Sequence, residues 1–154
     1  MRRRGWITAC LVILAATIAV PLVASASSVD TKLQIGFSLH FTGPTSTVGT
    51  FVASGAVRDS GTSIVTGLTL APQGNQDDAR LSGTQTFIGQ KGTITATFHG
   101  LAGPANDAHQ AGKGTFDIVD GTGEYAGIKG QGTFLVVVDV SANQIIGTED
   151  GQAN

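Results

Sequence analysis

The chain has 154 residues, of which 13% are charged and 6% aromatic, and its formal net charge at neutral pH is −2. This acidic balance argues against a nucleic-acid partner, which needs a basic face. The only cysteine is Cys10, close to the N-terminus. The remainder of the chain therefore has no disulfide, no thiolate nucleophile and no cysteine-bound metal.

The N-terminus has the pattern of a secretory signal peptide. Three arginines at positions 2–4 precede an apolar run over 6–23, and Ala24-Ser25-Ala26 supplies a small-residue cleavage site. A permanent membrane anchor is the alternative, because the run is about long enough to span a bilayer. Pro21 and the cleavage site favour removal of residues 1–26, export from the cell and no stable membrane association afterwards. The paired arginines leave Sec and twin-arginine export both open.

Residues 27–154 are predicted to form a single domain. Without the three leading arginines, six basic residues remain against 11 acidic ones, a net charge of −5, and 21 of the 22 glycines lie here. Glycine at this density, without a Gly-X-Y period, is typical of a sheet with many turns and bulges.

The first half of this domain alternates between apolar and polar residues, which is the pattern of half-buried strands. In 32–42 one face consists of Leu33, Ile35, Phe37, Leu39 and Phe41. Gly43-Pro44 ends this strand, and 51–57 continues the alternation in a second one. A turn is expected at 59–61, followed by a third strand over 63–70 that forms a hairpin with the second.

The second half continues in the same way. After a polar loop over 71–79, strands are predicted at 80–88, 93–100, 114–119, 132–140 and 145–148. A tight turn at 89–92, a long loop at 101–111 and a glycine-rich connector at 120–130 separate them, and 150–154 is expected to fray. No window has a sustained 3.6-residue apolar period. About eight short strands without a helix predict an all-β, eight-stranded antiparallel barrel, since closure removes exposed strand edges.

The segment from Phe116 to Phe134 reads F-x-I-x-x-GTG-x-YAG-x-x-G-x-G-x-F. It resembles the signature region of the allene oxide cyclase and dirigent-like barrels, and of related bacterial domains of unknown function. The resemblance covers about the last half of the domain and implies an eight-stranded antiparallel barrel with a cavity, often assembled as a trimer. It also implies action on hydrophobic or phenolic molecules by confinement of a reactive intermediate. The matching stretch lies outside the catalytic positions of these families, and the inward positions are nearly all apolar, so catalytic residues stay unknown.

Aromatic side chains are the candidate ligand contacts in such a barrel. The alternation places Phe37, Phe51, Phe98 and Phe116 inside, and an eight-stranded barrel can just hold one small ligand. Tyr125, on the connector, is expected to plug one end of the barrel and give its hydroxyl to a backbone group. The alternative for Tyr125 is a ligand contact at the rim.

Polar residues do not form a recognisable catalytic or metal site. His40 and His99 fall on outward faces of different strands and His109 falls in a loop, without the clustered spacing of zinc ligands. Asp77, Asp78 and Asp107 lie in loops but lack the spacing of a calcium loop. We therefore expect no metal and no cofactor.

Three functions remain open at this stage. The first is a secreted barrel that binds a small hydrophobic or aromatic molecule. The second is an isomerase-like or dirigent-like enzyme that works by confinement, which needs an ionisable side chain inside the barrel. The third is a structural or interaction protein of the cell exterior with a filled interior.

The strand at 132–140 is apolar on both faces. Leu135 and Val137 are expected to point outward, where an apolar patch usually marks an interface. A covering loop is the alternative. Together with the resemblance, this pattern predicts a homo-oligomer, a trimer, with Leu135 and Val137 at the contact.

Overall fold

The computed structural model describes residues 31–73, 78–106 and 109–154. The expected signal peptide, residues 1–26, lies outside the described residues, as do Asp77 and Asp107. Within the described part, no helix is long and apolar enough to cross a membrane.

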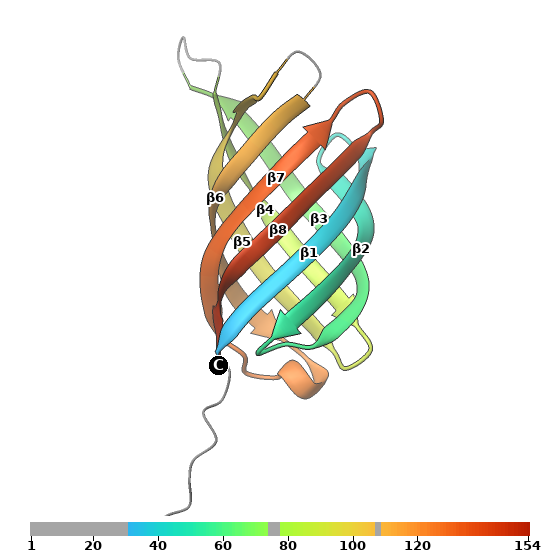
Figure 1. Cartoon of the computed structure of the whole chain (residues 1–154), viewed down its shortest axis with the longest axis vertical. Coiled ribbons are helices and arrows are strands. Elements are labelled where there is room, and N and C mark those ends of the chain that lie inside the picture. Colours follow the sequence, from blue (N-terminus) through green and yellow to red (C-terminus); the bar gives the residue numbers. More distant parts are fainter. Residues whose placement is uncertain (1–30, 74–77, 107–108) are drawn as a thin grey trace, which may run out of the picture.

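Eight antiparallel strands form one closed barrel in which each strand pairs with its neighbours in sequence and β8 pairs with β1 (Figure 1). The strands are β1 (Lys32–Gly43), β2 (Ser46–Gly55), β3 (Asp59–Pro72), β4 (Ala79–Gly89), β5 (Thr93–Pro104), β6 (His109–Gly121), β7 (Gly130–Asp139) and β8 (Gln144–Ala153). A single 3₁₀ turn, η1 (Gly123–Tyr125), lies between β6 and β7. The predicted all-β barrel of eight antiparallel strands is confirmed.

We call the end of the barrel that carries the β1–β2 and β7–β8 connections the upper end, and the end that carries η1 and the C-terminus the lower end, as drawn in Figure 1. Odd-numbered strands run upward and even-numbered strands run downward, because every pair is antiparallel. The depth of an interior residue can therefore be followed from its place in its strand.

The alternation predicted for 32–42 is confirmed, since Leu33, Ile35, Phe37 and Leu39 are all buried. In β3 the alternation shifts at Gly67, which adopts a left-handed φ of 63°. The pairing with β4 is irregular between Thr66 and Thr69. A bulge of this kind moves the inward positions on by one residue, so that Val65 and then Leu68 both reach the interior.

Several predicted boundaries are wrong. Residues 59–61 are the start of β3 and not a turn, and most of the loop expected over 101–111 consists of the ends of β5 and β6. Residues 150–153, expected to fray, continue β8 and pair with both β1 and β7. This last difference changes which residues reach the interior of the barrel.

Candidate functional site

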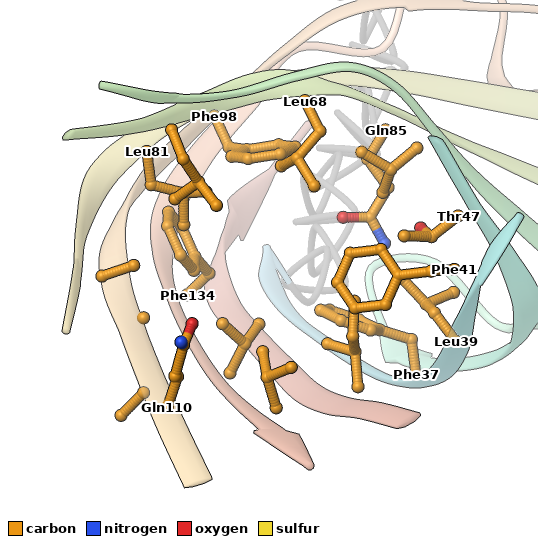
Figure 2. A pocket seen from close by; sticks show the side chains of 18 of the residues that line it. Phe37, Leu39, Phe41, Thr47, Leu68, Leu81, Gln85, Phe98, Gln110 and Phe134 are labelled. Atoms are coloured by element: carbon orange, nitrogen blue, oxygen red, sulfur yellow. The ribbon is translucent and has the colours of Figure 1, made fainter. Parts of the chain in front are cut away.

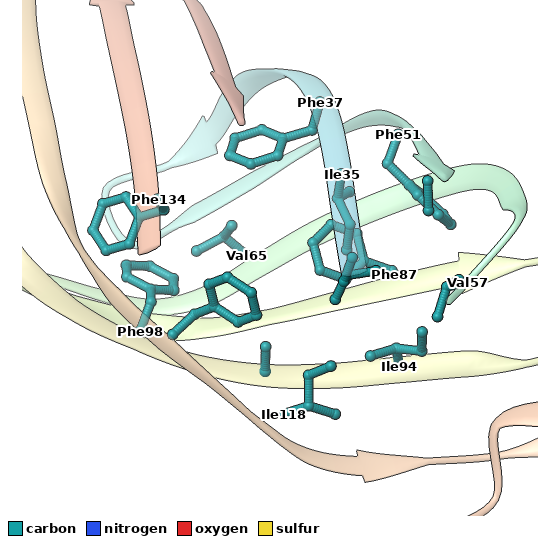
Figure 3. Packing of buried hydrophobic residues seen from close by; sticks show 14 of the residues in the cluster. Ile35, Phe37, Phe51, Val57, Val65, Phe87, Ile94, Phe98, Ile118 and Phe134 are labelled. Atoms are coloured by element: carbon teal, nitrogen blue, oxygen red, sulfur yellow. The ribbon is translucent and has the colours of Figure 1, made fainter. Parts of the chain in front are cut away.

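The lower half of the barrel interior is a packed core. Its buried side chains come from β1, β2, β4, β5, β6 and the β2–β3 connection, and Figure 3 shows several of them pointing into the barrel. They include Leu33, Ile35, Phe51, Val57, Phe87, Ile94, Phe116 and Ile118. The rings of Phe51 and Phe87 meet edge to face with centroids 5.1 Å apart, a favourable arrangement that fills the space between β2 and β4.

The upper half holds a cavity of about 90 Å³, which we call the upper cavity (Figure 2). Its inner end is formed by Phe37, Val65, Gln85, Phe98, Phe134 and Glu149. Its outer end includes Phe41, Leu70, Ala102, Gln110 and Val138. Leu70 and Gln110 are solvent-exposed, so the cavity opens at the upper end of the barrel.

The size and lining of the upper cavity suit a small apolar guest. A single water needs about 10–15 Å³ measured in this way, and an apolar cavity of about 150 Å³ takes up benzene. The enclosed space thus holds a few non-hydrogen atoms, with the remainder of a ligand at the open end. Most of the lining is aliphatic or aromatic, and its polar side chains are Thr47, Gln85, Gln110 and Glu149.

Cross-strand pairs of phenylalanine and glycine shape the interior. Each ring lies over the glycine directly opposite it on the neighbouring strand, where a Cβ would collide with the ring. The pairs are Phe37 with Gly147, Phe98 with Gly83, Phe116 with Gly132 and Phe134 with Gly114. Since the glycines lack side chains, the rings fold back on the barrel wall, and this arrangement accounts for four of the glycines of the domain.

Glu149 is the one buried acidic side chain among the described residues, and only 1% of it is exposed. It lies on β8 opposite Ile35 of β1 and Phe134 of β7, both apolar. Its Oε2 atom is buried and has no hydrogen-bond partner within the described part of the chain. Burial raises the pKa of this carboxyl to about 8, so the group is mostly protonated and neutral at pH 7.

Three further polar side chains are buried inside the barrel. Gln85 donates from Nε2 to Ser63 Oγ at 2.9 Å, which provides a partner for both residues. Thr47, near the upper end of β2, has a buried Oγ1 without a partner among the residues described. Within the described residues, the mostly apolar wall of the upper cavity thus presents two buried polar atoms without a partner, Thr47 Oγ1 and Glu149 Oε2.

Tyr125 closes the lower end of the barrel, on the side away from the upper cavity. Its ring packs against the core, as expected of a plug, and its hydroxyl donates to Asp59 Oδ2 at 3.0 Å. The expected backbone partner is therefore wrong. Burial, together with this bond to a carboxylate, raises the pKa of Tyr125 to about 12.

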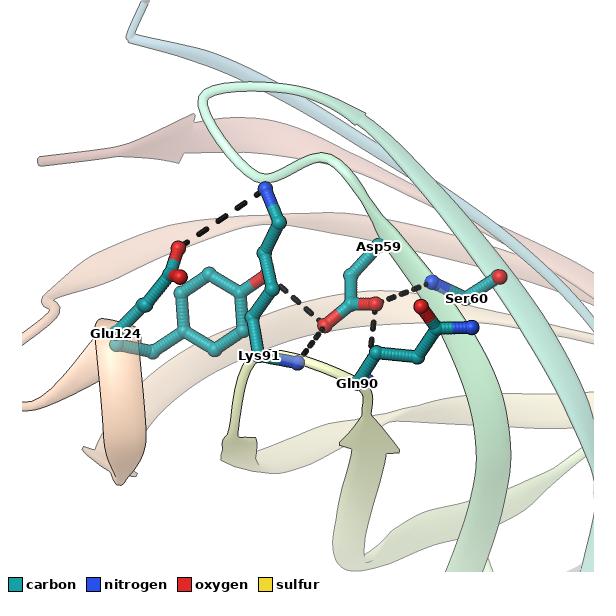
Figure 4. A network of polar contacts seen from close by, with 6 residues as sticks. Asp59, Ser60, Gln90, Lys91 and Glu124 are labelled. Carbon is teal, nitrogen blue, oxygen red and sulfur yellow. Dashed lines mark hydrogen bonds and ion pairs between the residues drawn. The ribbon is translucent and has the colours of Figure 1, made fainter.

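Asp59 joins three segments at this lower end (Figure 4). Besides the Tyr125 hydroxyl, it accepts the amide N–H groups of Ser60, Gln90 and Lys91 at 2.8–3.1 Å. Burial acts to raise the pKa of Asp59, but these four donors together hold it below its ordinary value. The network ties the start of β3 to the β4–β5 turn and to η1.

The five aromatic residues predicted as ligand contacts fall into three places. Phe37 and Phe98 line the upper cavity. Phe51 and Phe116 belong to the packed lower half, where they contact other core side chains. Tyr125 lies beside a separate depression at the lower end, lined by exposed residues that include Arg58, Lys91 and Glu124.

Sequence reasoning missed Glu149, because the last strand was predicted to end at residue 148. Extending the alternation from Ile145 through Gly147 places Glu149 on the inward face, and the burial of Ala153 continues the same series. The inward set is therefore mostly apolar but includes one carboxyl.

The histidines are dispersed. His40 and His99 are exposed on the outer face, as predicted, whereas His109 lies at the start of β6 and not in a loop. His109 Nε2 is 3.8 Å from Asp139 Oδ2 on β7. Across the described ranges, no three His, Cys, Asp or Glu side chains lie together in a way that would hold a metal ion.

Comparison of the chain with protein-family models, with curated proteins and with solved structures finds no match.

Proposed function

We propose that this protein is a secreted barrel that binds a small hydrophobic or aromatic molecule in the upper cavity. The observation that carries the proposal is the division of the interior, with a packed core below and an apolar cavity above that opens to solvent. A barrel that serves only as a scaffold gains stability from filling this space, because an unfilled apolar cavity costs free energy. The signal peptide predicted from the sequence at residues 1–26 is the reason to propose export.

The phenylalanine rings that line the upper cavity favour flat, aromatic ligands. Phe98 and Phe134 meet at a centroid distance of 5.6 Å and an interplanar angle of 71°, and Phe37 lies over Gly147 on the adjoining wall. Aromatic guests gain from edge and face contacts with such rings in addition to the burial of their surface. The enclosed volume of about 90 Å³ takes up part of a single ring, and the remainder of the ligand lies at the open end.

The test is a titration of isotope-labelled mature protein with ethylbenzene and with cyclohexane, followed by heteronuclear NMR. Saturable shifts confined to residues of the upper cavity are expected. Val136→Phe, which places a ring in the cavity, should abolish them, whereas Val52→Phe adds the same atoms on the outer face of β2 and should leave them intact. Absence of saturable shifts in the wild type, or equal shifts in the Val136→Phe variant, would contradict the proposal.

A second candidate function is catalysis by confinement of a reactive substrate. The presence of the Glu149 carboxyl inside the cavity favours this function. A carboxylic acid with a pKa of about 8 inside an apolar cavity is suited to general acid chemistry near neutral pH. Such an enzyme would isomerise its substrate, and Glu149→Gln would abolish turnover while binding of ethylbenzene persists. Turnover that survives Glu149→Gln would remove Glu149 from the chemistry.

We also propose self-association through the outer face of β7. Leu135 and Val137 are 56% and 42% exposed, and Ile146 of β8, opposite Val137, is 57% exposed. Together they make a contiguous apolar strip, of the kind that marks interfaces. Sedimentation should show a trimer for the wild type and a monomer for the Leu135→Lys, Val137→Lys variant. A monomeric wild type at high concentration, or an unchanged variant, would contradict the proposal.

A further inference from the structure

We infer that the ligand of the upper cavity carries a neutral hydroxyl group on its apolar body, and that the carboxyl of Glu149 is the hydrogen-bonding partner of this group at the inner end of the cavity. This inference rests on the proposed function, because it specifies the chemistry of the molecule that the cavity binds.

The position of Glu149 makes it the anchor point. In β8 the cavity is lined by Ile145 towards the upper end and by Glu149 four residues further down, at the boundary with the packed core. The side chain is buried, and Oε2 has no partner within the described residues. A buried polar atom that lacks a partner costs free energy. A ligand group that forms a hydrogen bond with this atom therefore adds more binding free energy than an apolar contact of equal area elsewhere in the cavity.

The surroundings of Glu149 decide which head group fits. Its cross-strand neighbours are Ile35 and Phe134, and desolvation is the cause of its raised pKa. A neutral carboxyl has one donor and keeps acceptor capacity, as an alcohol does, so the two groups can exchange hydrogen bonds in both directions. A ligand cation would require two charges to be desolvated together, which is costly in such a site. An alkane leaves Oε2 unpaired.

Thr47 offers a second polar contact at another depth. Its Oγ1 is buried and unpaired on the cavity wall, at the second residue of β2 and hence nearer the upper end than Glu149. A ligand with one hydroxyl at its inner end pairs with Glu149 alone. Thr47→Val is therefore expected to change the affinity for such a ligand far less than loss of the Glu149 carboxyl.

The experiment compares benzyl alcohol with ethylbenzene, which differ by a hydroxyl in place of a methyl group. A purely apolar site prefers ethylbenzene, because the hydroxyl of benzyl alcohol would lose its hydrogen bonds to water and find no partner in the site. The wild type is expected to bind benzyl alcohol about tenfold more tightly than ethylbenzene, in NMR or calorimetric titrations at pH 6. Glu149→Leu should reverse this order, whereas Glu149→Gln, which keeps a donor and an acceptor, should retain it.

Asp150→Asn is the matched control, since Asp150 is the next residue of β8 and lies on the outer face, where it accepts from Gln34. It should leave both affinities unchanged. A wild type that binds ethylbenzene more tightly than benzyl alcohol, or a Glu149→Leu variant that keeps the wild-type order, would overturn the inference and leave the proposed function standing. Failure of both compounds to bind in the cavity would overturn the proposed function itself.

Discussion

The buried carboxyl of Glu149 should make the stability of the barrel fall as the pH rises from about 5 to 8, and Glu149→Gln should remove this dependence. In the unfolded chain the carboxyl titrates near 4.5, and in the folded chain burial raises its pKa to about 8. Between these values the folded state holds a proton that the unfolded state has lost. Stability is therefore highest below pH 4.5, decreases with pH across this window and levels off above pH 8.

The magnitude follows from the width of the window. Each pH unit is equivalent to about 1.4 kcal/mol, so an interval of about 3.5 units between 4.5 and 8 corresponds to roughly 5 kcal/mol in total. This is an upper value, because an ionised carboxylate can draw water from the open end of the cavity. It remains large beside the ~5–15 kcal/mol that stabilises a typical domain.

Urea unfolding at half-unit intervals from pH 5 to 8.5 measures the effect for the wild type and for Glu149→Gln. Other titrating groups are shared by the two proteins, so the difference between their curves isolates Glu149. The variant should gain about 1 kcal/mol on the wild type for each pH unit from 5 to about 7.5, and little more above pH 8. Asp117→Asn, which removes an exposed outer-face carboxyl, should not show this gain. Parallel curves for wild type and Glu149→Gln would show that the Glu149 carboxyl does not titrate differently in the folded and unfolded states.

Two further predictions concern packing and the lower end. Gly147→Ala should cost about 1–3 kcal/mol and weaken ethylbenzene binding, because its Cβ overlaps the Phe37 ring and pushes it towards the cavity. Gly36→Ala, on the outer face with no atom within 4 Å of the added Cβ, should be neutral or slightly stabilising in the same urea assay, and an equal loss in both would contradict this packing. Tyr125→Phe removes the bond to Asp59 and should cost about 1 kcal/mol at pH 7. Because the pKa of Asp59 is lowered in the folded state, this loss should shrink only as the pH falls through that lowered pKa, and a loss that stays the same once Asp59 is protonated would argue against the hydrogen bond as its cause.

The fold was largely predictable because its main signal is local. Strict alternation in 32–42 identifies a strand with one buried face, and turn residues such as Gly43 and Pro44 mark where it ends. The shift at Gly67 was not predictable in this way, since a bulge changes the inward parity of β3 without any break in composition. The ends of β5 and β6 were missed because Pro104 and the surrounding glycines are typical of loops, yet they pair at the upper end of the barrel.

The candidate site depends on register, which the sequence does not display. Phe37 and Gly147 lie 110 positions apart, and only the pairing of β1 with β8 brings the ring over the glycine. Glu149 stands among polar and glycine residues in a segment that looks like a frayed end. Its inward position becomes visible only when β8 is known to continue to Ala153 and close the barrel.

The most direct test of the account is a crystal structure of the mature protein pressurised with xenon. The central claim is that the barrel interior is packed below and hollow and apolar above. Xenon enters dry apolar cavities large enough to hold it. Xenon density is expected in the upper cavity among Phe37, Phe98 and Phe134, and none is expected between Phe51 and Phe87 in the lower half. An upper half filled by side chains, with no xenon bound, would contradict it.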